Sequence, residues 1–168
     1  RIPSSMGMDS KLPGSSASEG RGTIDTRVTV LVLPADVVRK LLPAGLELAP
    51  QPVVPFEWHP LFILCSHDRF GAWFGDMDYQ EMMLAVPWVQ LTDRLAPYPG
   101  PFIYMPRLYL NDALPRRLGV HIYGWEKQAA TIDVVTAGSR TDYTVTADGA
   151  GEPTLIGSFR ELPGRGPR

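Results

Sequence analysis

The residue best suited to covalent chemistry in this sequence is Lys127, which directly follows the apolar and aromatic stretch 119–125. The other two lysines are Lys11, in a Ser/Gly-rich segment, and Lys40, in a short predicted helix. We interpret residues 119–125 as a strand, so Lys127 alone is expected beside a core. Burial favours the neutral amine of a lysine, which can attack a carbonyl and form a Schiff base. The alternative is a strand-end lysine that extends its ammonium group to water.

Glu81 is the second candidate for chemistry, because it lies in the apolar stretch 79–89. Residues two apart on a strand share a face, so Tyr79 and Glu81 are expected to point the same way. A carboxylate on a buried face has to be paired or protonated. The alternative is an outward-facing glutamate on an amphipathic strand, and the pattern favours neither.

Other common chemistries are not supported by the spacing of residues. The sequence contains no Gly-x-Gly-x-x-Gly motif opening a helix, no phosphate loop and no Cys-x-x-Cys pair. His59, His67 and Asp68 are too few and too scattered for a typical metal site, so we predict no metal and no cofactor. Cys65 lies in an apolar run, which is typical of a small buried hydrophobe rather than a nucleophile.

Composition excludes several classes of partner. The chain has 168 residues, a formal net charge of −2 and no basic run, so we expect neither nucleic acid nor an anionic membrane as a partner. No apolar run approaches the ~20 residues of a membrane span, and residues 1–22 do not resemble a signal peptide. The single cysteine fits a reducing compartment. We therefore predict a cytoplasmic protein.

The elements that must position these residues are mainly strands, as 17 prolines and 16 glycines indicate many turns. We predict a disordered leader at 1–22, a single domain at 23–160 and a loose tail at 161–168. Pro34 and Asp36 favour a short helix at 35–42. Segments 67–76 and 93–101 are interpreted as loops. Predicted strands are 27–33, 61–65, 79–89 (interrupted at Pro87), 102–110, 131–135, 142–147 and 154–159.

Five segments in order resemble the acetoacetate decarboxylase family, across roughly residues 25–160. They are the strand and helix of 32–47, His59-Pro60 before an apolar strand, Tyr79-Gln80-Glu81, the extended segment 104–112, and the stretch 119–128. Gly119 and Trp125 match the family's glycine and aromatic residue in that last stretch. Lys127 then matches the Schiff-base lysine, and Glu81 the active-site glutamate.

This resemblance implies a mainly β fold, an antiparallel barrel or cone with one short helix near 35–42. It implies a Schiff-base-forming lyase, similar to a decarboxylase, that acts on a small β-keto or 2-oxo acid without a cofactor. Lys127 and Glu81 would be catalytic. Arg27 is the candidate for the family's arginine near the substrate carboxylate, and we expect His121, Trp125 and Tyr104 to contact substrate.

The sequence departs from the family pattern around the lysine. Val120 and His121 replace an arginine and a glutamate, Glu126 replaces a proline, and Gln128 replaces a second lysine. Any activation of Lys127 must therefore rest mainly on burial, and Glu126 is expected to point to the opposite face of the strand. These changes favour a divergent lyase, aldolase or dehydratase over a decarboxylase of acetoacetate itself.

The same departures keep a second hypothesis open, a non-catalytic barrel that binds a small ligand between Trp73, Trp88, Tyr104 and Trp125. Family members continue beyond the last predicted strand, so we expect an incomplete barrel. Exposed strand edges favour association, and we predict a homo-oligomer.

Overall fold

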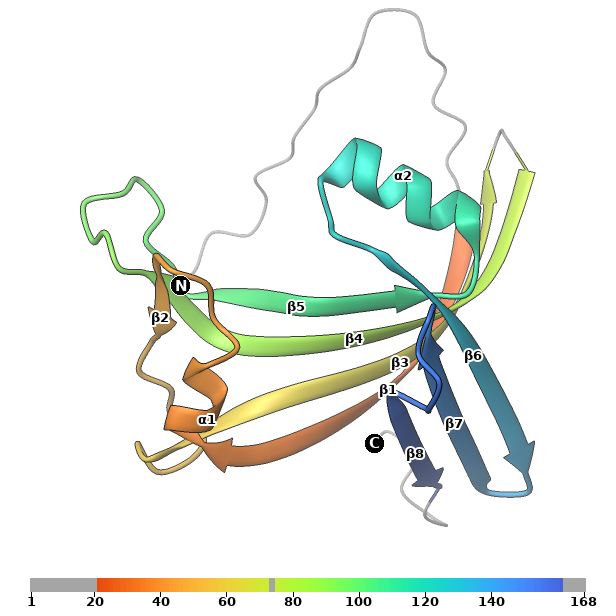
Figure 1. Cartoon of the computed structure of the whole chain (residues 1–168), viewed down its shortest axis with the longest axis horizontal. Coiled ribbons are helices and arrows are strands. Elements are labelled where there is room, and N and C mark those ends of the chain that lie inside the picture. Colours follow the sequence, from red (N-terminus) through yellow and green to blue (C-terminus); the bar gives the residue numbers. More distant parts are fainter. Residues whose placement is uncertain (1–20, 73–74, 162–168) are drawn as a thin grey trace, which may run out of the picture.

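The computed structural model describes residues 21–72 and 75–161, and these form one eight-stranded sheet (Figure 1). Its strand order is β1-β3-β4-β5-β6-β7-β8, with β2 paired to β4. Neighbours are antiparallel except β5 and β6. The sheet curves into a nearly closed barrel, which confirms the predicted fold class. The elements are β1 (Arg21–Pro34), α1 (Ala35–Arg39), β2 (Leu46–Leu48), β3 (Trp58–Ala72), β4 (Gly75–Leu91), β5 (Phe102–Leu110), α2 (Ala113–Tyr123), β6 (Gln128–Ala137), β7 (Arg140–Ala147) and β8 (Leu155–Arg160).

The long strands β3, β4 and β5 bury residues on both faces, because side chains alternate along each strand. One face packs against β6, β7 and β8 around Cys65, Met82 and Tyr143, and farther along against α1. On the opposite face, Tyr79, Leu108 and Leu110 form a separate apolar cluster. Figure 1 shows α2 over this second face and the β6–β8 arm on the other side. The cluster around Tyr79 and the larger part of the apolar core therefore lie on opposite faces of the same sheet.

Helix α1 is shorter than predicted and ends at Arg39 instead of residue 42. It begins after Pro34 and buries Ala35 and Val38, the latter against Leu61 and other apolar residues of the sheet. Pro43 follows and cannot continue a helix. The helix lies at the end of the long strands that is remote from α2 (Figure 1).

The prediction of a strand at 119–125 is wrong, because residues 113–123 form α2 and residues 124–127 link it to β6. The Asp112 carboxylate accepts a hydrogen bond from the Leu114 N–H at 2.7 Å, which caps the helix. Gly124 ends the helix in the left-handed region, at φ 67°. The sequence does contain these start and stop signals, but an Asn-Asp pair such as Asn111-Asp112 is equally typical of a turn.

The loop predicted at 67–76 is also wrong, because β3 extends to Ala72 and β4 begins at Gly75. Pairing with β1 and β4 stabilises this polar part of β3 as a strand.

Pro87 does not interrupt β4 either. The Pro87 carbonyl accepts a hydrogen bond from buried His59 at 2.7 Å, outside the regular ladder. His59 is therefore a structural residue.

The predicted strands 131–135 and 142–147 are confirmed within β6 and β7, which a turn at Gly138, with φ 60°, joins. The predicted leader lies outside the described residues except for Arg21 and Gly22, which begin β1. Trp73 and the tail from residue 162 lie outside them as well. Among the described residues, no helix has the length and apolar character needed to cross a membrane.

Candidate active site

Lys127 and Glu81 form a buried ion pair. The Lys127 Nζ donates to Glu81 Oε2 at 3.3 Å, and the two side chains are only 6% and 7% exposed. Glu81 lies on β4, paired with Ser66 of β3 and Leu110 of β5, so the central part of the sheet fixes it. Lys127 lies in the linker immediately before β6. Strand β4 and this linker bring together two residues that are 46 positions apart.

The pair faces a cavity of about 560 Å³ between α2 and the sheet. Its wall is mainly apolar, with a few polar groups at one side, as is usual for sites that bind small molecules. Among the described residues lining the cavity, Lys127 is the only basic side chain. The lining residues are Ile24, Thr26, Ser66, Asp68, Phe70, Met77, Tyr79, Glu81, Met83, Pro115, Leu118, Gly119, Trp125 and Lys127.

Helix α2 approaches the lysine closely because residue 119 is a glycine. A Cβ atom at this position would lie 2.4 Å from the Lys127 Cε and 3.0 Å from its Nζ. Pro115, Leu118 and Gly119 are spaced at i, i+3 and i+4, and together they form the part of α2 that lines the cavity. The family glycine that the sequence suggested thus has a physical role, since it leaves space for the lysine side chain.

Trp125 lies beside the amine, with the Lys127 Nζ 5.4 Å from its ring centroid. That separation lies within the range of cation–π attraction. The indole lines the cavity and is 44% exposed, so it also reaches solvent. Trp125 is therefore the predicted substrate-contacting residue that the structure does place at the site.

Burial raises the pKa of the Glu81 carboxyl. The adjacent Lys127 ammonium opposes this shift, and the nearby Asp68 carboxylate adds to it. Burial also raises the pKa of Tyr79, and the nearby Asp68 and Glu81 carboxylates add to this shift. Tyr79 and Glu81 are both buried on the cavity side of β4, as the spacing predicted. Glu81 is thus a carboxylate that accepts a proton more readily than an exposed one.

Two polar residues of the cavity are not among the site residues predicted from the sequence. Ser66 and Asp68 on β3 are 1% and 6% exposed. We had considered Asp68 only as a metal ligand beside His67. The sequence does indicate their burial, because positions 66 and 68 share a strand face with the apolar Leu64 and Phe70. Among the described residues, no group of three or more His, Cys, Asp or Glu could hold a metal ion.

Three predicted substrate-contacting residues do not line this cavity. Arg27 points to the opposite face of β1, where its guanidinium donates to the Tyr143 hydroxyl at 3.2 Å. Tyr104 packs in the apolar cluster beside α1. His121 is an exposed residue in the last turn of α2. The error for His121 follows from the wrong strand prediction, because alternation along a strand does not apply to a helix.

The substituted neighbours of Lys127 lie away from the amine. Val120, Glu126 and Gln128 are exposed, and none of them lines the cavity. Trp88, proposed as part of an aromatic pocket, is absent from the described cavity lining as well. The immediate surroundings of the amine are instead Glu81, Trp125 and the backbone of α2 at Gly119.

Comparisons with known proteins identify a family match and similar folds. The family model described as "Acetoacetate decarboxylase (ADC)" matches residues 15–154. No curated protein sequence matches the chain. One similar solved structure is the enduracididine biosynthesis enzyme MppR, complexed with the condensation product of pyruvate and imidazole 4-carboxaldehyde. It shares 18% identity over 83% of this chain and 55% of its own, with a TM-score of 0.56.

A second similar structure is an acetoacetate decarboxylase, with 16% identity over 82% of this chain and 49% of its own and a TM-score of 0.53. These identities establish likeness of fold, and the chain spans about half the length of either neighbour. The family match covers most of the sequence, including both members of the buried ion pair. The chain therefore belongs to the acetoacetate decarboxylase family.

Proposed function

We propose that the protein is a Schiff-base-forming lyase that acts on a small β-keto or 2-oxo acid. The observation that carries this proposal is the Lys127–Glu81 pair, buried at the wall of a mainly apolar cavity. An amine held there is shielded from bulk water and has a proton acceptor 3.3 Å away. The structural likeness to MppR and to an acetoacetate decarboxylase supports the same reaction class.

The first step is proton transfer from the Lys127 ammonium to Glu81, whose pKa burial raises. The neutral amine adds to the substrate carbonyl, and loss of water then gives a protonated imine. With a β-keto acid, the electrons of the bond to the carboxyl carbon move into the imine as carbon dioxide leaves. The enamine takes up a proton at carbon, and water releases the ketone from Lys127.

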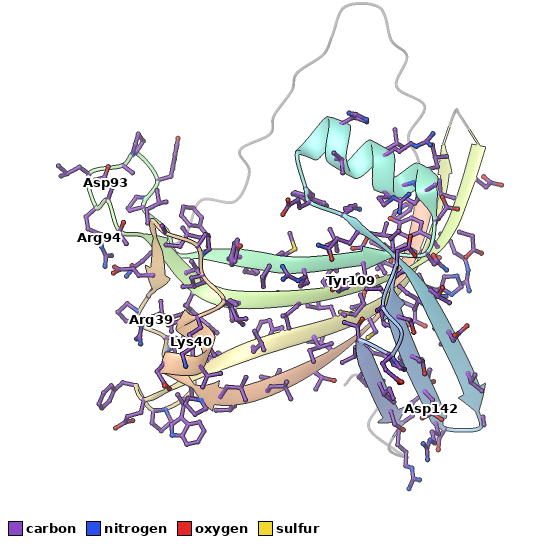
Figure 2. The ribbon with its side chains drawn as sticks, in the orientation of Figure 1. Arg39, Lys40, Asp93, Arg94, Tyr109 and Asp142 are labelled. Carbon is purple, nitrogen blue, oxygen red and sulfur yellow. The ribbon has the colours of Figure 1, made fainter. Side chains whose placement is uncertain are left out.

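Borohydride trapping tests the covalent step. The chain is incubated with acetoacetate, pyruvate or 2-oxobutanoate, reduced and mapped by mass spectrometry, and we expect an adduct on Lys127. The Lys127→Arg variant keeps a positive charge but should form no adduct. Lys40→Arg changes a lysine of the loop after α1, at the remote end of the molecule, and should leave the adduct unchanged (Figure 2).

Two outcomes would reject the lyase proposal. Absence of a Lys127 adduct with every oxo acid, together with a thermal shift on adding them, would favour the binding barrel instead. Adducts spread equally over Lys11, Lys40 and Lys127 would show that the buried lysine has no special reactivity.

We also propose that the protein is a cytoplasmic homo-oligomer. Within the described residues β1 ends the strand order, so one of its edges pairs with no other described strand. Val28, Val30 and Val32 on this strand are about half exposed, which supports self-association. Cys65 is a free, buried thiol, in agreement with a reducing compartment. Light scattering after size exclusion tests the oligomer, and a monomer mass at 50 μM would reject it.

A further inference from the structure

Two buried polar atoms of the cavity, Ser66 Oγ and Asp68 Oδ1, have no hydrogen-bond partner among the residues that the structure describes. Buried polar atoms are nearly always paired in folded proteins, so each unpaired one requires an explanation. Both residues are more than nine-tenths buried and line the cavity that contains Lys127. Tyr79 is the cross-strand neighbour of Asp68, but Oδ1 of the Asp68 carboxylate remains unpaired among the described residues. A ligand in the cavity would meet two acceptor atoms that the protein does not satisfy.

The strand register places these atoms close to the reacting amine. Ser66 pairs with Glu81, the partner of Lys127, and Asp68 pairs with Tyr79 in the next row on the same face. Two residues along a strand span about 7 Å. A ligand whose carbonyl carbon is bonded to Lys127 can therefore place a group three bonds farther along against this second row.

The charges around the site indicate which group would bind. The described lining residues contain the carboxyl groups of Asp68 and Glu81 but one basic side chain, Lys127. An anionic or apolar group beside Asp68 would leave Oδ1 unpaired and would add repulsion or desolvation. A hydroxyl would donate to Asp68 Oδ1 and accept from the Ser66 hydroxyl, whereas a protonated amine would donate to both oxygens.

We propose that Ser66 and Asp68 form a specificity subsite for substrates that carry a hydrogen-bond donor, a hydroxyl or a protonated amine, a few bonds from the reacting carbonyl. This inference rests on the proposed Schiff-base function and specifies its substrate class. Glu81 and Lys127 perform the chemistry, whereas Ser66 and Asp68 select the distal end of the substrate.

The test uses three ketones of nearly equal size: pentan-2-one, 4-hydroxybutan-2-one and 4-aminobutan-2-one. They differ only in a terminal methyl, hydroxyl or ammonium group. We expect half-maximal borohydride trapping on Lys127 at roughly tenfold lower concentration for a donor-bearing ketone than for pentan-2-one, as hydrogen bonds to a charged acceptor contribute about that factor. A preference for the amine alone assigns the subsite to cations, and a preference for both assigns it to donors in general.

Substitutions test which residues cause the preference for donor-bearing ketones. Asp68→Asn and Ser66→Ala should each reduce the ratio between donor-bearing and apolar ketones by roughly threefold to tenfold. Trapping of pentan-2-one should persist in both variants, which shows that they fold. Asp142→Asn removes a carboxylate on β7, far from α2, and should leave all three values unchanged (Figure 2).

Equal trapping of the three ketones by the parent chain would reject the proposed subsite, because water molecules would then satisfy Ser66 Oγ and Asp68 Oδ1 as well as a ligand does. A donor preference that survives both substitutions would overturn it as well. Failure of every ketone and oxo acid to label Lys127 would instead reject the Schiff-base function itself. The two proposals therefore fail in distinguishable ways.

Discussion

Burying Lys127 and Glu81 together removes two ionic groups from water, which costs several kcal/mol per ion before their attraction offsets it. An apolar pair of similar volume would avoid that cost. The arrangement is therefore poorly explained as a stabilising device. It is better explained as a reactive group that the fold maintains at the expense of stability.

We predict that Glu81→Leu alone lowers the free energy of unfolding by about 3 kcal/mol, because it leaves the lysine buried without its partner. The double variant Glu81→Leu with Lys127→Met should regain this loss and match or exceed the parent. Urea unfolding of the parent, single and double variants measures the difference. A double variant that stays clearly less stable than the parent would show that the ion pair is a net stabilising contact.

The second residue-scale prediction concerns the free thiol of Cys65. Burial raises its pKa to about 11, and the positive charge of Arg27 opposes the shift only in part. A thiol with a raised pKa favours the folded state while it is neutral, so this contribution is lost as the pH rises through about 11.

At pH 8 we expect an aromatic disulfide reagent to label the native chain at least roughly tenfold more slowly than the urea-unfolded chain, because the thiolate is the reactive form. Equal labelling rates in the two states would contradict the buried position of Cys65 on β3.

At the scale of elements, α2 is the part of the fold that closes the site. It is capped by Asp112 and Gly124, and it presents Pro115, Leu118 and Gly119 to the cavity. The sheet provides Glu81, but without α2 above it the lysine would face solvent. The close approach of α2 depends on the missing side chain at position 119.

We predict that Gly119→Ala lowers the rate of adduct formation on Lys127 by roughly tenfold while the fold persists. The new methyl group would meet the end of a flexible side chain, so Lys127 moves away from Glu81 without disruption of the backbone. Alanine also favours a helix over glycine by up to ~1 kcal/mol, which offsets part of the lost contact.

Trapping rates and melting temperatures together test this prediction. Val120→Ala, on the solvent side of α2, serves as the matched control and should leave trapping unchanged. A Gly119→Ala variant that traps at the parent rate would show that the lysine does not need this space.

At the scale of the whole molecule, contacts between the first strand and the last strands bring the sheet close to closure. The Arg27 guanidinium of β1 donates to the Tyr143 hydroxyl of β7 and lies 3.9 Å from Glu161, just beyond β8. These contacts lie on the opposite face from the Lys127 cavity. Arg27 therefore has a structural position, although the resemblance had suggested a substrate contact.

We predict that Arg27→Met lowers the free energy of unfolding by about 1–2 kcal/mol, because the buried Tyr143 hydroxyl loses its partner. The concentration of oxo acid for half-maximal trapping on Lys127 should not change. Arg140→Met breaks an exposed pair with Asp142 and should cost less than about 0.5 kcal/mol. Weaker trapping by Arg27→Met at unchanged stability would restore the substrate-binding role.

Sequence alone was sufficient to single out Lys127 and Glu81, which the structure brings together, and to predict most strands. Lys127 was identifiable because lysines are few and this one follows an apolar stretch, and the order of five segments related it to Glu81. The class of fold followed from β-branched runs separated by Pro and Gly. Helix α2 was missed because its residues are as apolar as those of a strand, and its capping signals resemble those of a turn.

The sequence by itself determined which residues could react and that strands would hold them, because residue type and local periodicity are properties of neighbouring positions. Tertiary structure alone decided which faces meet. Whether Arg27 points toward the lysine or away from it depends on strand register, and a shift of one residue reverses the face. The roles of Ser66, Asp68 and Gly119 likewise arise only when β3, β4 and α2 enclose one cavity.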